Sequence, residues 1–152
     1  MNRPSWDSYF MSIATLVATR STCLRRQIGA VIVKDKRILA TGYNGAPTAA
    51  HHCIDVGKCL REEMGVPSGQ RHELCNAVHA EQNAILQAAK FGIPIDGATL
   101  YCTNRCCFIC AKMVVNSGIT KVFYNYGYPD PQTEALFKNT RVIEVCINPK
   151  GV

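Results

Sequence analysis

Residues 76–92, NAVHAEQNAILQAAKFG, decide how this chain folds. Apolar side chains such as Ile85 and Ala88 recur at helical spacing, and the pattern stops at a glycine. We therefore predict a helix over about residues 80–91. His79 lies directly before this predicted helix, and Glu81 lies in its first turn.

The motif CFIC, from Cys107 to Cys110, opens the next predicted helix, over residues 108–117. Each motif follows a loop and begins a helix, so the two helix N-termini can converge at one edge of a sheet. Positive helix ends and a cation both lower the pKa of a thiol, which makes both cysteines better ligands as thiolates. With the imidazole of His79, these thiolates would leave one position of a tetrahedral zinc open, as in catalytic sites.

Neither motif is specific alone, because a Cys-x-x-Cys pair can be redox-active and His-x-Glu is common by chance. Together, at two helix starts with a strand between them, they approach the H-x-E and P-C-x-x-C signature of zinc nucleobase deaminases. Glu81 is close enough to the metal to reach water without being a ligand. It is therefore the expected general base and acid.

The remaining periodicity predicts alternating helices and strands. A helix begins after Ser5, and strands over residues 30–34 and 38–43 form a hairpin around Asp35 and Lys36. Further strands are expected over residues 98–102, 121–124 and 142–145, with a last helix over residues 133–139. This order implies an α/β fold with a mixed five-stranded sheet flanked by helices in three layers. We expect residues 1–152 to form a single domain, because the chain is too short for two ordinary ones.

The composition is that of a folded protein outside the membrane. Hydrophobic residues make up 47% of the chain and charged residues 18%, unlike disordered chains. No apolar run has the roughly 18 residues of a membrane span, and MNRPSWDSYF does not resemble a signal peptide. We expect a cytoplasmic location, where the nine cysteines stay reduced. The net charge of +6 fits either a nucleic-acid binder or an enzyme with a phosphorylated substrate.

The sequence resembles the deoxycytidylate (dCMP) deaminases of the bacterial late-competence and phage kind, within the zinc-dependent cytidine deaminase superfamily. The resemblance covers nearly the whole chain, in STCLRRQIGAVIVKDKRILATGYNGAP, HELCNAVHAEQNAI, CFICAKMVVNSGI and YNYGYPD. It implies the cytidine-deaminase fold and hydrolysis of dCMP to dUMP and ammonia, which supplies dUMP for thymidylate synthesis. One departure is Cys106, which stands where the family usually has proline. Cys106 could compete as a ligand, although Cys107 preserves the spacing to Cys110.

The resemblance also implies how the substrate is held. Zinc makes water acidic, and Glu81 takes its proton and delivers protons to N3 and to the departing amino group. The backbone N–H of Ala80 is suited to hold the base and the developing charge. Asn44, in the GYNG run, is similar to the family asparagine that contacts the substrate near its sugar. The alternative is that Asn44 only turns the chain beside Gly45.

Charged and aromatic side chains are candidates for the phosphate and the base. Arg26, with Arg25, lies just before the first strand and is suited to bind the 5′-phosphate, the alternative being a solvated arginine. Tyr126 and Tyr128 follow the fourth strand and are candidates to cover the base, although aromatic residues there also serve as packing.

Residues 44–76 form a long irregular stretch in which Gly, Pro, His and Cys accumulate. Some dCMP deaminases have an additional zinc in the corresponding regions, which implies a second, structural zinc. The candidate ligands are Cys23, Cys53, Cys59 and Cys75, with His51, His52 and His72 beside them. Four thiolates would close a tetrahedral site and order the stretch, whereas the alternative is buried free cysteine. Cys102 and Cys146 lie in predicted strands and are expected in the core.

The expected partner is the nucleotide dCMP, with no membrane and no stable nucleic acid. Many relatives are activated by dCTP and inhibited by dTTP, and relatives are usually homo-oligomers, trimers or hexamers. One alternative is another nucleotide or nucleoside deaminase, or a tRNA adenosine deaminase, which shares the metal residues. The GYNG run and the Cys- and His-rich stretch argue against the tRNA enzyme. The other alternative, a non-catalytic zinc module, has no need of Glu81 beside an open metal position.

Overall fold

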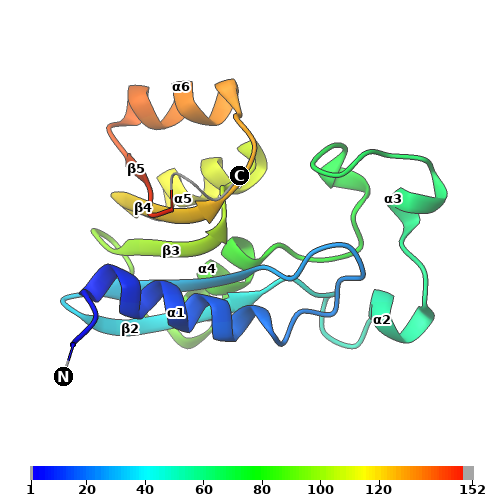
Figure 1. Ribbon diagram of the computed structural model, residues 1–152, viewed down its shortest axis with the longest axis horizontal. Helices are drawn as coiled ribbons and strands as arrows, with labels where there is room; N and C mark the ends of the chain where they lie inside the picture. Colours follow the sequence, from blue (N-terminus) through cyan, green and yellow to red (C-terminus); the bar gives the residue numbers. More distant parts are fainter. Residues whose placement is uncertain (1, 149–152) are drawn as a thin grey trace.

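A computed structural model describes residues 2–148 of the chain (Figure 1). Its centre is a five-stranded sheet in the order β2-β1-β3-β4-β5. The strands are β1 (Gly29–Lys34), β2 (Arg37–Tyr43), β3 (Thr99–Asn104), β4 (Lys121–Tyr126) and β5 (Ile143–Cys146). Strand β1 pairs antiparallel with β2 and β3, whereas β4 pairs parallel with β3 and β5. The mixed five-stranded sheet expected from the sequence is confirmed.

Helices cover both faces of this sheet. The longer ones are α1 (Trp6–Ala18), α4 (Ala80–Phe91), α5 (Phe108–Asn116) and α6 (Pro131–Thr140). Figure 1 shows α1 on the near face and α4 and α5 behind the sheet. The short helices α2 (Cys53–Val56), α3 (Leu60–Glu63) and η1 (His72–Leu74) lie between β2 and α4, in a segment that projects beyond the sheet. Within residues 2–148, no helix combines the length and the apolar character that crossing a membrane requires.

Alternating side chains along β1 and β3 build two cores. Ile32 and Leu100 pack in the core that contains α4 and α5, whereas Val31 and Tyr101 pack against α1. Successive side chains of a strand point to opposite faces, so a strand covered on both sides must be apolar throughout. Strand β1 meets this condition, because every residue in it is buried except Lys34.

Two glycines let helices lie directly against the sheet. At Gly42 of β2, an added Cβ would lie 2.2 Å from the carbonyl oxygen of Ala80 in the first turn of α4. At Gly29 of β1, an added Cβ would lie 2.1 Å from the carbonyl oxygen of Ala14 in α1. The lack of a side chain at Gly42 therefore sets where α4 begins relative to the sheet.

The predicted elements are present with shifted boundaries. The hairpin turn lies at Asp35 and Lys36, where φ is 51° and 60°. Helix α6 begins at Pro131, two residues earlier than predicted, because the Asp130 carboxylate accepts hydrogen bonds from two backbone N–H groups there. Strands β3 and β4 each continue two residues further than predicted, so Tyr126 belongs to β4.

The stretch predicted to be irregular contains short helices that the sequence did not reveal. Helices α2 and α3 have four residues each, too few for a periodic pattern to be recognised. Arg61, in α3, joins parts of the stretch: its guanidinium donates to the carbonyl of Gln70, and its own carbonyl accepts from the Val66 N–H at 2.8 Å. Hydrogen bonds to the backbone therefore help to hold this stretch where apolar periodicity is lacking.

Candidate active site

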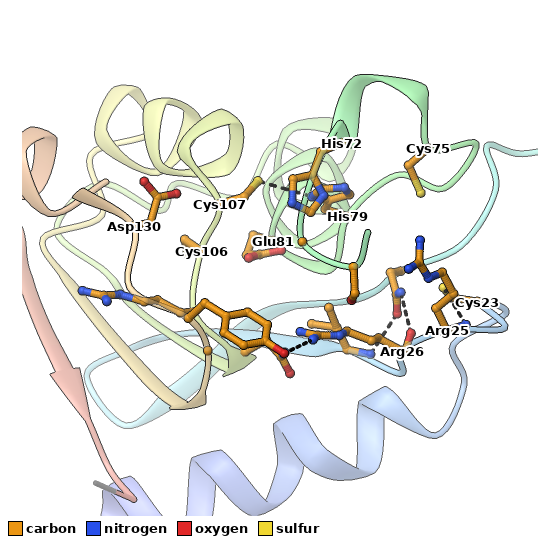
Figure 2. Close-up of a pocket in the computed structure, with 18 of the residues that line it drawn as sticks. Cys23, Arg25, Arg26, His72, Cys75, His79, Glu81, Cys106, Cys107 and Asp130 are labelled. Atoms are coloured by element: carbon orange, nitrogen blue, oxygen red, sulfur yellow. Dashed lines mark hydrogen bonds between the residues drawn. The ribbon is translucent and has the colours of Figure 1, made fainter. Parts of the chain in front are cut away.

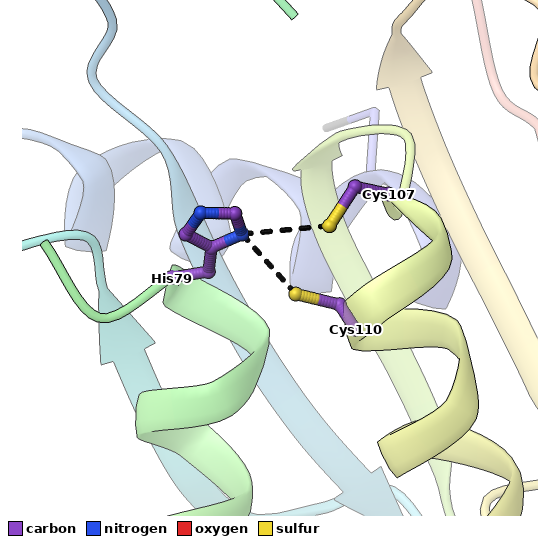
Figure 3. Close-up of side chains that lie close together, drawn as sticks. All are labelled: His79, Cys107 and Cys110. Atoms are coloured by element: carbon purple, nitrogen blue, oxygen red, sulfur yellow. Dashed lines mark hydrogen bonds between the residues drawn. The ribbon is translucent and has the colours of Figure 1, made fainter. Parts of the chain in front are cut away.

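The N-termini of α4 and α5 bring three potential metal ligands together (Figure 3). His79 and Cys107 immediately precede the two helices, and Cys110 lies in the first turn of α5. His79 Nδ1 lies 3.5 Å from Cys107 Sγ and 3.3 Å from Cys110 Sγ. The ligand atoms of these residues all lie within 4.8 Å of one another, and no other such group of His, Cys, Asp or Glu occurs among residues 2–148. We call these three residues the metal cluster.

The electrostatics of the metal cluster suit a cation. Burial acts to lower the pKa of His79, but interactions with the thiols of Cys107 and Cys75 outweigh it and raise that pKa to about 10. The hydrogen bond with Cys110 lowers the pKa of the Cys107 thiol to about 4, whereas the same bond and burial raise the pKa of Cys110. The interaction between these two thiols therefore favours one thiolate beside one thiol when no cation is bound. A divalent cation would stabilise both as thiolates.

Glu81 lies beside the metal cluster in the first turn of α4 and is 4% exposed. Burial raises the pKa of its carboxyl group, and the charge of the Cys107 thiol adds to this effect. Burial, and then the charge of the nearby Glu81 carboxylate, raises the pKa of the Cys102 and Cys106 thiols. A carboxyl group with a raised pKa in a cavity wall is suited to accept and return protons.

Of the two adjacent cysteines, Cys107 and not Cys106 belongs to the metal cluster. Cys106 is 1% exposed and packs in the core between the sheet and α4. The departure from proline therefore adds a buried thiol without changing the spacing to Cys110. Cys102 is fully buried as expected, whereas the expectation for Cys146 is wrong: it lies on the edge strand β5 and is only half-buried.

A cavity of about 350 Å³ opens beside the metal cluster (Figure 2). Its walls come from the loop before β1, the stretch between β2 and α4, the starts of α4 and α5, and the loop after β4. In Figure 2, Glu81 and His79 lie between Asp130 on one side and Arg25 and Arg26 on the other. This volume is within the range of small-molecule sites, which extends from about 300 to 1,000 Å³.

Asn44 holds the loop that carries the arginines. Its Oδ1 atom accepts hydrogen bonds from Ser21 Oγ at 2.6 Å and from the Ile28 N–H at 2.9 Å. Its Nδ2 atom donates to the carbonyl of Arg26 at 2.8 Å. Asn44 is 6% exposed and also lines the cavity. Asn44 therefore has a structural role in this loop, and contact with a sugar stays a prediction.

The two arginines predicted to bind phosphate have different surroundings. Arg25 lies 3.4 Å from the Glu62 carboxylate and donates to the carbonyl of Val66 at 3.0 Å. Arg26 donates to the hydroxyl of Tyr128 at 3.3 Å and lies 5.2 Å from the centre of that ring (Figure 2). Within residues 2–148, Arg26 forms no salt bridge. Arg26 is therefore the better placed of the two to bind an anion.

Tyr126 does not occupy the position expected for it. It is 50% exposed at the end of β4, and the cavity wall contains Tyr128 instead. The reason is that β4 runs longer than predicted, which leaves Tyr126 paired with Asn104 in the sheet. Ala80 is fully buried with its side chain in the core, so any contact with a ligand would come from its backbone.

The cysteines expected to bind a second zinc are neighbours, but they are less closely grouped than the metal cluster. Burial and then the thiols of Cys23, Cys59 and Cys75 raise the pKa of Cys53, so all four are within electrostatic reach. In the described part of the chain they do not form a group as compact as the metal cluster. A hydrogen bond with His79 lowers the pKa of the Cys75 thiol to about 7. Cys75 thus lies beside the metal cluster.

Sequence reasoning missed several residues of the cavity wall. Arg61 is 7% exposed although it is charged, and nothing in its local sequence indicates burial. Arg105 and Asp130 also line the cavity. The position of Arg105 directly before the two cysteines was the one available signal. His72, noted only as a neighbour of cysteines, packs edge-on against His79 with ring centres 5.0 Å apart.

The sheet topology and the two motifs at helix starts define a zinc-dependent nucleobase deaminase. A family model described as the cytidine and deoxycytidylate deaminase zinc-binding region matches residues 4–126. The chain belongs to this cytidine and deoxycytidylate deaminase family.

Individual relatives agree with this family. The chain is 41% identical to ComE operon protein 2 of Bacillus subtilis, over 93% of this chain and 71% of that protein. It is 41% identical to deoxycytidylate deaminase of Saccharomyces cerevisiae over 92% of this chain, but it spans only 44% of the yeast protein. The structure of dCMP deaminase from cyanophage S-TIM5 in complex with dCMP and dUMP matches with a TM-score of 0.78 and 31% identity, over 97% of this chain and 100% of that chain. The fold is that of a dCMP deaminase.

Proposed function

We propose that this protein deaminates dCMP to dUMP and thereby supplies dUMP for thymidylate synthesis. The observation that carries the proposal is a single cavity lined by Glu81, two members of the metal cluster, and Arg26. A nucleoside monophosphate needs both a reaction centre for its base and a cation for its phosphate. Similarity to the yeast enzyme and to the cyanophage protein bound to dCMP and dUMP supports the same substrate.

The donor set of the metal cluster fits zinc. One imidazole nitrogen and two thiolates, from His79, Cys107 and Cys110, are preferred zinc ligands and would hold the ion with one position left for water. When bound, zinc supplies Lewis acidity, which lowers the pKa of a water molecule toward neutrality. The two helix N-termini at this point favour the thiolate form of both cysteines.

Glu81 moves the protons of the reaction. Its carboxylate takes a proton from the attacking water, and the water oxygen forms a bond to C4 of the pyrimidine. The resulting carboxylic acid delivers this proton to N3. The carboxylate then takes the remaining proton from the hydroxyl on C4 and passes it to the amino nitrogen, so that the C4–N bond breaks, the C4 carbonyl forms and ammonia leaves. Burial raises the pKa of Glu81, which makes its acid form a sufficiently stable proton carrier near neutral pH.

Once the base is placed, the expected contacts of the sugar and the phosphate can be assigned. With the pyrimidine against Glu81, the backbone N–H of Ala80 is the expected contact for the base. One hydrogen of Asn44 Nδ2 is used by the Arg26 carbonyl, and the second remains for a sugar hydroxyl. The Arg26 guanidinium is then the expected partner of the 5′-phosphate, and Tyr128 takes over from Tyr126 as the aromatic residue near the base.

We also propose a second, structural zinc held by Cys23, Cys53, Cys59 and Cys75. These thiols lie within electrostatic reach of one another. The stretch that carries three of them has short helices and little apolar periodicity. Four thiolates around one ion would order it, since free energy of metal binding at a closed site is free energy of folding.

Three further expectations stay predictions. A homo-oligomer, trimer or hexamer, and regulation by dCTP and dTTP are implied by the family resemblance, whereas a cytoplasmic location is the expectation from the sequence itself. Together with a single domain over residues 1–152, they describe a nucleotide-metabolising enzyme that needs neither a membrane nor a stable nucleic-acid partner.

A comparison of substrates tests the proposed function. Purified protein would be incubated separately with dCMP, deoxycytidine, cytidine, dCTP and a tRNA oligonucleotide while ammonia release is measured. We expect the highest kcat/KM with dCMP, and loss of turnover when zinc is removed by a chelator and its return when zinc is restored. Equal turnover of deoxycytidine and dCMP, or faster turnover of the tRNA oligonucleotide, would show that the proposal is wrong.

A further inference from the structure

Arg105 is a largely buried arginine directly before Cys106 and Cys107, and its side chain is only 11% exposed. Its Nη1 atom lies 2.9 Å from a Glu134 oxygen, and its Nε atom donates to Glu144 Oε1 at 3.0 Å. Its Nη2 atom also donates to Glu144 Oε1. All three nitrogens of the guanidinium are therefore occupied by carboxylates from α6 and β5.

The backbone of Arg105 binds a second segment. Its N–H donates to the carbonyl of Tyr126 at 2.6 Å. At Gly127, where φ is +155°, an added Cβ would lie 2.3 Å from Arg105 Cβ. The loop after β3, which leads to Cys107, is thus packed directly against the loop after β4, which carries Tyr128. Arg105 thus contacts the loop after β4 through its backbone and its Cβ atom, and α6 and β5 through its guanidinium.

These contacts distinguish Arg105 from Arg26, the arginine proposed to bind the 5′-phosphate. Arg105 lines the cavity, but its charge is already balanced by Glu144, whose side chain is 12% exposed. The carboxylate of Glu134 is 49% exposed and adds a second, more hydrated partner. A guanidinium held at fixed angles by carboxylates orients the chain that carries it. With two carboxylates already beside it, this guanidinium is poorly suited to bind a further anion.

We propose that Arg105 is a positioning residue, which holds the loop of the zinc ligand Cys107 and the loop of Tyr128 in one fixed arrangement. The inference rests on the proposed function for the identity of the metal and the nucleotide. If Arg105 acts in this way, its replacement speeds the release of zinc and also weakens substrate binding. Because Arg105 does not contact the phosphate, KM should rise equally for dCMP and deoxycytidine.

The test compares Arg105→Met, Arg105→Lys and the double variant Arg105→Met Glu144→Leu with the wild-type protein. Three quantities are measured: zinc release to a chromogenic chelator, melting temperature, and KM and kcat for dCMP and deoxycytidine. Arg37→Met is the matched control, because Arg37 is exposed on β2 and outside the cavity wall. The wild-type protein is assayed first, since absence of zinc or turnover there would refute the proposed function and not the role of Arg105.

We expect Arg105→Met to release zinc about tenfold faster and to raise KM for both substrates by a similar factor, as for residues that orient metal ligands. The Lys variant keeps the charge without the paired geometry and should fall between; it carries the test if Arg105→Met does not fold. The double variant removes both buried charges, which should restore the melting temperature, but its zinc release should stay fast.

If the double variant released zinc as slowly as the wild-type protein, Arg105 would contribute only to stability and the proposal would be overturned. A loss confined to dCMP would overturn it as well, because Arg105 would then bind the phosphate.

Discussion

Substitution of Gly42 by alanine tests how precisely the sheet positions the start of α4. The added Cβ would lie 2.2 Å from the Ala80 carbonyl oxygen and 2.4 Å from the Ala84 nitrogen. Because non-bonded carbon and oxygen atoms approach to about 3.3 Å, the helix must withdraw by roughly 1 Å. His79 and Glu81 lie at the end of the helix that moves.

This displacement has separate consequences for stability and for catalysis. Overpacking of this kind costs about 1–3 kcal/mol, and the lower entropy of the unfolded chain offsets about 0.4–1 kcal/mol of it. A net loss of about 1–2 kcal/mol corresponds to a melting temperature lower by about 2–8 °C for a chain of this size. Misplacement of catalytic groups by 1 Å lowers the rate by about 10²-fold. Activity of Gly42→Ala should therefore fall far more than its stability.

Gly29→Ala is the matched control. Its added Cβ would lie 2.1 Å from the Ala14 carbonyl oxygen and 2.5 Å from the Ala18 nitrogen, a similar clash but with α1 on the opposite face. Calorimetry and ammonia release with dCMP are measured for both variants. We expect similar losses of stability and a much larger loss of kcat/KM for Gly42→Ala. Equal losses of activity in the two variants, or activity of a destabilised Gly42→Ala within about threefold of wild type, would refute this reasoning.

Two further predictions concern the phosphate and the second zinc. Arg26→Ala should raise KM for dCMP by about 10- to 100-fold, which corresponds to the loss of a hydrogen bond to a charged group, and should leave KM for deoxycytidine nearly unchanged. Steady-state kinetics of this variant and of the control Arg20→Ala, at an exposed position, would test this. Equal effects on both substrates would contradict it. Mass spectrometry should find two zinc ions per chain in protein purified without chelator, one fewer in Cys59→Ser Cys75→Ser, and no change in the control Cys146→Ser. A single zinc that persists in the double variant would mean that these cysteines serve only in packing.

Short-range patterns predicted much of the fold and of the reaction centre. The turn at Asp35 and Lys36 and the helix starts after His79 and Cys107 depend on local residues, and the structure has them where the sequence indicates. Cys107 was predicted as the ligand from its spacing to Cys110, with the adjacent Cys106 as the alternative. In the structure Cys107 lies in the metal cluster and Cys106 packs in the core.

Features that depend on distant contacts could not be predicted in the same way. Arg105 meets Glu144 across 39 positions of sequence, and no local pattern records such a pairing. The four-residue helices α2 and α3 are too short to show a period. Tyr126 and Tyr128 were both predicted to lie in the loop after β4, but β4 includes Tyr126, because the end of this strand is set by pairing with β3.

Glu81→Gln tests the central claim most directly, because the amide keeps the size of the side chain but cannot accept a proton from water. Turnover of dCMP by purified Glu81→Gln, measured as ammonia release with zinc content determined on the same sample, should fall by about 10²- to 10⁴-fold. Zinc content and melting temperature should match those of the wild type, since the carboxylate is not one of the proposed ligands. A zinc-loaded Glu81→Gln protein that retains more than about a tenth of wild-type turnover would contradict the account, because the proton transfer assigned to Glu81 would then come from another group.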